Sequence, residues 1–235
     1  MDSAPSARPP GSASLWLPGV VRFGLTPLSL VVLGRRDRNV PFPRRLTDPH
    51  RGRKDRIMQP EVVVVTGPPG AGKTTVARRL AEDSQRGVHL EADTFWHFIK
   101  AEWVAPWLPE SRDQNETVID VIAEATAGYA LGGYAVVVDG IIGPWFLERF
   151  IGPLTKVGIR VNYVVLRPDE PTALTRAMAR GAEALVDEEP IRKMYDEFCN
   201  LGAYETNVLD SSNMSPAETA TAIRQGVDKG RYRVA

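Results

Sequence analysis

A lysine and a threonine follow a glycine-rich loop in this sequence of 235 residues. The segment Gly67–Thr74 reads Gly-Pro-Pro-Gly-Ala-Gly-Lys-Thr, which fits the phosphate-binding pattern G-x-x-x-x-G-K-[ST]. Glycines can adopt positive φ and carry no Cβ, so backbone N–H groups can converge on phosphate oxygens. Lys73 would reach the β- and γ-phosphates, and the hydroxyl of Thr74 would be a ligand of Mg²⁺.

The elements around this loop match the motif. Val62–Val65 predicts a strand buried on both faces, and Gly72–Arg86 predicts a helix whose N-terminus would favour an anion. A Gly/Pro turn before an ordinary helix is the alternative, but it leaves the matching strand and helix unexplained. The predicted contacts to nucleotide are Gly67, Pro68, Pro69, Gly70, Ala71, Gly72, Lys73, Thr74 and Thr75.

An acidic residue follows the second predicted strand, Val88–Ala92. Ligands of open α/β sheets bind at the carboxyl ends of the strands, so Asp93 would face the same crevice as the loop. Its carboxylate could orient an attacking hydroxyl or accept its proton. An N-cap of a helix that begins at Thr94 is the alternative role, and the two roles are compatible.

A second acidic residue ends the third predicted strand, Tyr134–Val138. Asp139 would hold Mg²⁺ directly or through water, together with Thr74. The alternative is a turn formed by the pair Asp139-Gly140.

Three arginines are candidates for neutralising charge on a transferred phosphoryl group. Arg176 and Arg180 are four residues apart, so they share one face of a helix predicted over 171–180. A Gly/Ala-rich stretch, 181–184, follows them and could be a mobile lid. Arg192 lies in the first part of the next predicted helix, 188–201. Each of them could equally be a solvated surface arginine.

Several side chains near the predicted strand ends could line a site for a second substrate. The tryptophans could supply an apolar wall, or they could pack in the core or the lid. Gln114 and Asn115 could bind a polar acceptor or cap a helix, and His97 could be an acid–base group or a structural histidine. The tryptophans concerned are Trp96, Trp103, Trp107 and Trp145.

Strands alternate with helices from Met58 onward, which is the pattern of a parallel sheet covered on both sides. The sequence therefore predicts an α/β fold: a three-layer α/β/α domain with a parallel five-stranded sheet. Ser215 to Glu218 predicts a capping box that starts a final helix. The remaining predicted elements are strands 159–166 and 207–210 and helices 114–131 and 216–229.

The charge is unevenly distributed. Residues 1–57 hold 11 of the 29 Lys and Arg and 4 of the 29 Asp and Glu, so residues 58–235 hold 18 and 25. The acidic folded part argues against nucleic acid as the main partner. The single cysteine, Cys199, excludes an intramolecular disulfide and fits a reducing cytoplasm.

The first 57 residues differ from the rest of the chain. They hold 8 of the 19 prolines and several arginine clusters, without sustained periodicity. Their apolar patch, 15–33, is interrupted by Arg22 and two prolines, so neither a transmembrane span nor a signal peptide is predicted. We expect a disordered extension over 1–57 and a catalytic domain over 58–235, with translation starting at Met58 as one hypothesis.

Residues 58–235 resemble the small-molecule kinase branch of P-loop proteins, which includes shikimate, gluconate and adenylylsulfate kinases, chloramphenicol phosphotransferase and zeta-toxin-like kinases. The loop 67–75 matches their nucleotide loop, and Asp93 matches the acidic residue that many of them place near the acceptor. Val136–Gly140 is similar to the third strand of nucleoside monophosphate kinases. There, an arginine-bearing segment grips a nucleotide phosphate, whereas this chain has Ile141-Ile142-Gly143-Pro144.

This resemblance implies an ATP-dependent phosphotransferase with Mg²⁺, acting on a hydroxyl of a small molecule as a monomer or homodimer. It places Arg176 and Arg180 at the lid and the segment 209–212 beside adenine. The sequence has no N-K-x-D motif for guanine. A nucleotide-dependent switch and a kinase of a nucleotide sugar remain alternatives.

Overall fold

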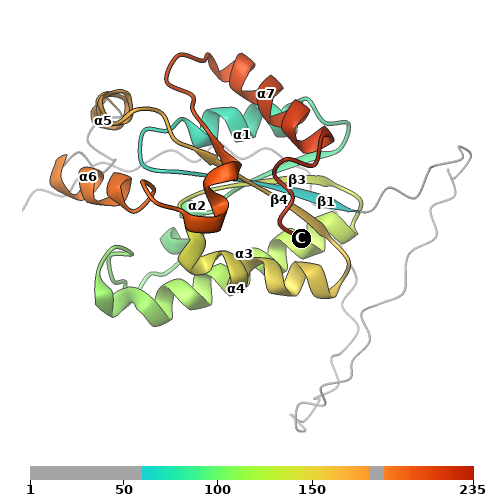
Figure 1. The fold of residues 1–235 in the computed structure, drawn as a ribbon. Coiled ribbons are helices and arrows are strands. Elements are labelled where there is room, and N and C mark those ends of the chain that lie inside the picture. Colours follow the sequence, from blue (N-terminus) through green and yellow to red (C-terminus); the bar gives the residue numbers. More distant parts are fainter. Residues whose placement is uncertain (1–59, 180–187) are drawn as a thin grey trace, which may run out of the picture. The chain divides into compact units, whose positions relative to one another are not determined.

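The computed structural model describes residues 60–179 and 188–235, which form a parallel sheet with helices on both faces (Figure 1). The strand order is β2-β3-β1-β4-β5, so β1 lies at the centre. Each strand end lies within one residue of its predicted position, and the predicted five-stranded α/β/α fold is confirmed. The strands are β1 Glu61–Thr66, β2 Gly87–Glu91, β3 Ala135–Asp139, β4 Arg160–Leu166 and β5 Val208–Leu209.

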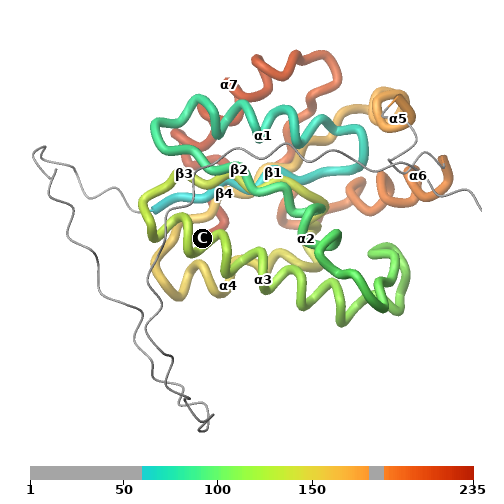
Figure 2. The backbone as a smooth tube through the Cα atoms, turned by 180° about the vertical axis from the view of Figure 1, so that it is seen from behind, coloured from blue at the N-terminus to red at the C-terminus, as the bar shows by residue number. Residues whose placement is uncertain are grey.

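Two pairs of long helices cover the two faces of the sheet (Figures 1 and 2). Helices α1 (Lys73–Glu82) and α7 (Pro216–Asp228) lie on one face, and α3 (Arg112–Leu131) and α4 (Pro144–Lys156) lie on the other. The capping box of Ser215 and Glu218 is present at the start of α7, as predicted. The shorter elements are α2 Asp93–His97, α5 Glu170–Met178, α6 Glu188–Asp196 and the 3₁₀ turns η1 Pro109–Ser111 and η2 Gly202–Asn207.

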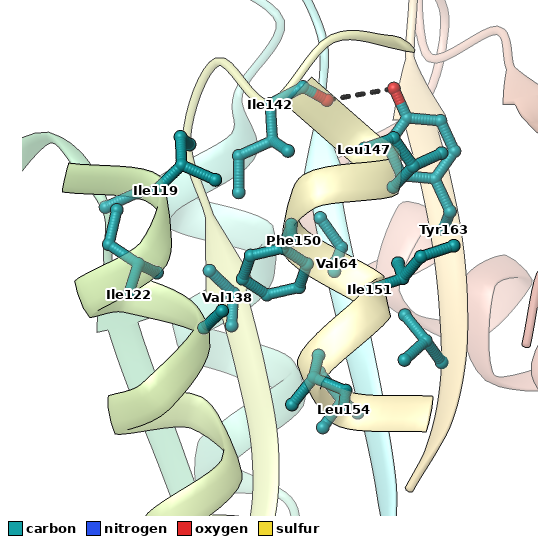
Figure 3. Packing of buried hydrophobic residues seen from close by; sticks show 14 of the residues in the cluster. Val64, Ile119, Ile122, Val138, Ile142, Leu147, Phe150, Ile151, Leu154 and Tyr163 are labelled. Carbon is teal, nitrogen blue, oxygen red and sulfur yellow. Dashed lines mark hydrogen bonds between the residues drawn. The ribbon is translucent and has the colours of Figure 1, made fainter. Parts of the chain in front are cut away.

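The valines of β1 are buried because alternate side chains enter two different cores. Val62 and Val64 pack with α3 and α4, whereas Val65 packs with α1 and α7. Figure 3 shows the first of these cores, where Phe150 of α4 lies among side chains from the sheet and from α3. Burial on both faces explains the run of valines.

Two predicted helices are shorter than expected. Helix α1 ends at Glu82 rather than Arg86, because the chain turns back at Gly87, where a Cβ would lie 1.8 Å from the Ala81 carbonyl oxygen. Helix α6 ends at Asp196 rather than Leu201. The chain after it forms a tight turn that includes Phe198, and Phe198 is fully buried against the α3–α4 core.

Helix α4 occupies a segment for which the sequence analysis predicts no element. Pro153 lies inside it and can donate no backbone hydrogen bond. Four apolar side chains nevertheless recur at helical spacing on its buried face, and their burial outweighs the lost bond. They are Leu147, Phe150, Ile151 and Leu154.

Phe150→Ala is expected to lower the free energy of unfolding by about 3–5 kcal/mol, because Phe150 is fully buried and alanine would leave a cavity. The control is Phe98→Ala, since Phe98 is 66% exposed and its loss should cost under about 0.5 kcal/mol. Urea unfolding followed by circular dichroism measures both. Equal losses in the two variants would contradict the packing described here.

Some of the predictions fall on residues that the structure does not describe. The extension 1–57, Met58, Arg180 and the Gly/Ala-rich stretch 181–184 all lie outside the described ranges. Within those ranges, every helix is too short or too polar to cross a membrane.

Candidate functional site

The glycine-rich loop joins β1 to α1 and leaves no room for side chains at two of its glycines. Gly67 has φ 140° and Gly70 has φ 77°. A Cβ at Gly67 would lie 2.0 Å from the Leu166 carbonyl oxygen, and one at Gly70 would lie 1.9 Å from the Ala173 carbonyl oxygen. The loop is therefore held between the end of β4 and helix α5, which fixes its backbone.

Lys73 folds back over this loop. Its Nζ donates to the carbonyl oxygens of Gly67 at 2.9 Å and Pro68 at 3.0 Å, and the residue is 5% exposed. These bonds fix a buried ammonium group at the mouth of the loop. A cation held there can bind phosphate oxygens that approach the backbone N–H groups.

The N-terminus of α1 faces the same loop. Gly72 is its N-cap residue, with φ 85°, and among the described residues no side chain caps the helix. The first N–H groups of an α-helix lack intrahelical partners and carry a partial positive charge. This helix end therefore suits an anion, as the motif predicts.

Thr74 and Asp139 meet at the ends of α1 and β3. The Thr74 hydroxyl donates to Asp139 Oδ2 at 2.6 Å, and Asp139 is only 3% exposed. Among the described residues, no group of three or more His, Cys, Asp or Glu side chains could hold a metal ion. Mg²⁺ commonly uses one or two protein oxygens and completes its shell with phosphates and water. The Thr74–Asp139 pair fits that kind of site.

The segment after Asp139 is fixed by two residues that the sequence analysis does not identify. The Thr66 hydroxyl accepts from the Ile142 N–H at 3.0 Å. The Tyr163 hydroxyl donates to the Ile142 carbonyl at 2.9 Å, as Figure 3 shows. Burial raises the pKa of Tyr163 well above its ordinary value, so it remains a donor. Both bonds anchor the loop next to the Asp139 carboxylate.

Asp93 lies beside the Asp139-Gly140 turn. A Cβ at Gly140 would lie 2.6 Å from Ala92 Cβ and 3.6 Å from Asp93 Oδ1, and the Ala92 N–H donates to the Asp139 carbonyl at 2.7 Å. Asp93 is the first residue of α2, whose N-cap is Ala92, so the predicted capping role is wrong. Asp93 is an exposed residue at the same edge of the sheet as the phosphate loop.

A pocket of about 300 Å³ lies on the other side of the loop. Arg176 of α5 lines it, and the predicted adenine segment contributes Ser211. Ser211 is 3% exposed, and its Oγ has no hydrogen-bond partner among the described residues. The other lining residues include Gly70, Gly72, Thr75 and Met214. A buried hydroxyl without a partner is costly, so a ligand that bonds it would gain affinity.

The arginines occupy different surroundings. Arg176 joins the pocket and donates weakly to the Ser212 carbonyl at 3.3 Å. Arg192 instead forms ion pairs with Glu188 of α6 and Glu170 of α5, and the hydrogen bond that it donates to Glu188 is the main cause of its raised pKa. Arg192 does not line the pocket. The structure thus brings Arg176, but not Arg192, to the loop.

Gln114 and Asn115 are occupied by the chain segment before them. Gln114 bonds both the N–H and the carbonyl of Val104, at 2.9 and 2.7 Å. Asn115 accepts from the indole of Trp96 at 2.8 Å and donates to the Pro106 carbonyl at 2.7 Å. Their observed role is therefore to hold the segment between α2 and α3, rather than to cap α3.

One of the four candidate tryptophans is packed against the core, and the other three lie at the surface. Trp96 is partly buried against the α3–α4 core, whereas Trp103, Trp107 and Trp145 are 47%, 49% and 48% exposed. His97 is also exposed. The exposed rings come after β2 and β3 in the chain, as Asp93 follows β2 and Asp139 ends β3.

His89 is a site residue that the sequence analysis does not identify. It lies in β2, and its Nε2 is 2.5 Å from Asp139 Oδ1. The alternation of side chains along β2 could have placed His89 on the same face as α1. Val88 and Leu90 face the apolar core, while His89 and Glu91 face α1.

The comparison with protein families agrees with this geometry. A family model for an AAA domain matches residues 62–201, which is more than half of the chain. The chain belongs to this family. The match covers the phosphate loop, Asp93, Asp139, Arg176 and Arg192.

Several relatives of this chain are kinases. A cytidylate kinase of Staphylothermus marinus is 26% identical over 72% of this chain and 97% of its own length. A shikimate kinase of Corynebacterium diphtheriae is 32% identical over 34% of this chain and 49% of its own. The structure of a sugar kinase from Janibacter superposes with TM-score 0.55 at 18% identity, covering 73% and 95% of the two chains. The predicted resemblance to P-loop small-molecule kinases is confirmed.

Proposed function

We propose that this protein transfers the γ-phosphoryl group of ATP to a hydroxyl group of a small molecule, with Mg²⁺ as cofactor. The observation that carries the proposal is the exposed Asp93 carboxylate beside the Asp139-Gly140 turn. A nucleotide switch needs the loop, Lys73 and the Thr74–Asp139 pair, but it needs no base at this position. A phosphotransferase needs all of them.

Each group has a role in this reaction. The loop N–H groups and Lys73 would hold the β- and γ-phosphates, and Thr74 with Asp139 would hold Mg²⁺, which neutralises phosphate charge when bound. Asp93 would accept the proton of the acceptor hydroxyl as its oxygen bonds to the γ-phosphorus. The bond from that phosphorus to the bridging oxygen breaks, and ADP leaves. Arg176 would contact the nucleotide, and Arg180 and Arg192 remain candidates for the lid.

The acceptor side favours a molecule without a phosphate group. The segment 140–148, which follows Asp139, contains no lysine or arginine and ends in Glu148. From Asp93 to Ser111 the only lysine or arginine is Lys100, against three acidic residues, Asp93 included. Phosphate groups are bound by arginine and lysine, so these segments suit a neutral or cationic acceptor.

The test is incubation of the purified protein with γ-labelled ATP, Mg²⁺ and pools of hydroxylated metabolites and antibiotics. We expect label in a product from a neutral or cationic pool, and ADP in equal amount. Label in none of the pools, together with slow hydrolysis alone, would overturn the proposal and favour a switch. Label confined to nucleotides or sugar phosphates would retain a kinase but overturn the proposed acceptor class.

A further inference from the structure

His89 lies within hydrogen-bonding distance of the Asp139 carboxylate, as Thr74 does. Its Nε2 lies 2.5 Å from Oδ1, while Thr74 donates to Oδ2 at 2.6 Å. The His89 side chain is 12% exposed and that of Asp139 is 4% exposed. A carboxylate only accepts hydrogen bonds, so Nε2 of His89 carries the proton of this contact.

Two bonds from opposite sides hold the carboxylate in one orientation. With both oxygens engaged, Asp139 cannot rotate about its last side-chain bond without losing one of these partly buried hydrogen bonds. The Thr74 hydroxyl has one proton, and that proton points at Oδ2. Its lone pairs are then directed away from Asp139, which is the state in which a hydroxyl can bind a cation.

The sheet register explains why this histidine reaches Asp139. Strands β2 and β3 are parallel neighbours in which His89 pairs with Val137 and Glu91 with Asp139. Side chains two residues apart share a face, so His89 leans along the strand toward Asp139 on the face covered by α1. Glu91 lies 3.7 Å from the other ring nitrogen of His89 and 3.5 Å from Arg78 of α1.

We propose that His89 is a positioning residue that fixes Asp139 and, through it, the Thr74 hydroxyl for binding of Mg²⁺ with ATP. The inference rests on the proposed use of Mg-ATP and assigns a further residue to that site. Groups that orient metal-binding residues typically contribute about 10–100-fold to metal affinity. A histidine that only fills space beside α1 would contribute to stability instead.

The test compares two substitutions at this position by nucleotide binding. The ratio of the dissociation constants of a fluorescent ATP analogue in excess EDTA and in excess Mg²⁺ measures how much the metal strengthens binding. His89→Leu removes the donor and is expected to lower this ratio by about 10–100-fold. His89→Gln places an amide donor near the position of Nε2 and is expected to keep most of the ratio.

Several results would overturn the proposal: a wild-type ratio of one, an unchanged ratio in His89→Leu, or equal weakening with and without Mg²⁺. If His89→Leu does not fold, His89→Asn replaces it, since its shorter amide cannot reach Asp139. A thermal melt of each variant reports folding. The binding measurement needs no acceptor, so it is independent of the kinase assay. A kinase assay without product would overturn the proposed function, whereas the role of His89 would still be decided by the binding ratio.

Discussion

Replacing Lys73 by methionine is expected to lower phosphoryl transfer by about 100–1,000-fold, the usual effect of removing one preorganised donor to a developing charge. Methionine keeps most of the stem of lysine, so the packing of a residue that is 5% exposed changes little. What is lost is the ammonium group that bonds the carbonyls of Gly67 and Pro68. The measurement is release of label from γ-labelled ATP, with the acceptor found in the pooled assay.

The control for this variant is Lys156→Met, at the exposed end of α4. It makes the same chemical change away from the loop and should leave the transfer rate as it is. Lys73→Met removes the donor to the carbonyls of Gly67 and Pro68, which could destabilise the loop. A thermal melt of the variant therefore distinguishes loss of function from loss of fold. A folded Lys73→Met variant with the wild-type rate would remove the loop from the mechanism.

The geometry of the phosphate loop could be predicted from sequence because its residues are contiguous. Gly67, Gly70 and Gly72 adopt the positive φ values that the motif requires. Thr74 and Asp139 are 65 residues apart, yet both follow parallel strands whose carboxyl ends must meet at one edge. The proximity of Thr74 and Asp139 therefore follows from the topology of a parallel sheet, without knowledge of their contact.

The acceptor half could not be predicted because its side chains find partners through tertiary packing. Nothing local in the sequence pairs Asn115 with Trp96, or Gln114 with Val104, since these contacts depend on how the segment after α2 folds against α3. Arg192 could not be separated from Arg176 for the same reason. Its partners, Glu170 and Glu188, come from two helices.

Two errors come from competing physical effects. Helix α4 has a clear helical period, but Pro153 argues against a helix, and only the depth of the core beneath Phe150 shows which effect dominates. His89 lies in a short strand at the edge of the sheet, where a polar residue usually faces solvent. Its side chain is largely shielded because α1 covers that edge and brings Thr74 and Arg78 to the same row of side chains.

Asp93→Asn is expected to lower phosphoryl transfer by about 100–10,000-fold, the range typical of general bases, while the affinity for ATP stays unchanged. The substitution keeps the size of the side chain and removes its capacity to accept a proton. Asp93 does not line the nucleotide pocket, which involves residues on the far side of the loop. Asp93→Asn should therefore change the transfer rate without changing nucleotide binding, whereas Lys73→Met removes a group proposed to bind the nucleotide itself.

Asp113→Asn provides the matched control, because Asp113 is an exposed aspartate in the first turn of α3. Transfer by the control should equal that of the wild type.

The comparison also separates the proposed roles of the two site carboxylates. Loss of Asp139 would weaken Mg²⁺-dependent binding, since that carboxylate is bonded to Thr74, whereas loss of Asp93 leaves that bond in place. If Asp93→Asn transferred phosphate at the wild-type rate, the base would have to be another group. If it lost ATP affinity as well, Asp93 would belong to the nucleotide half of the site.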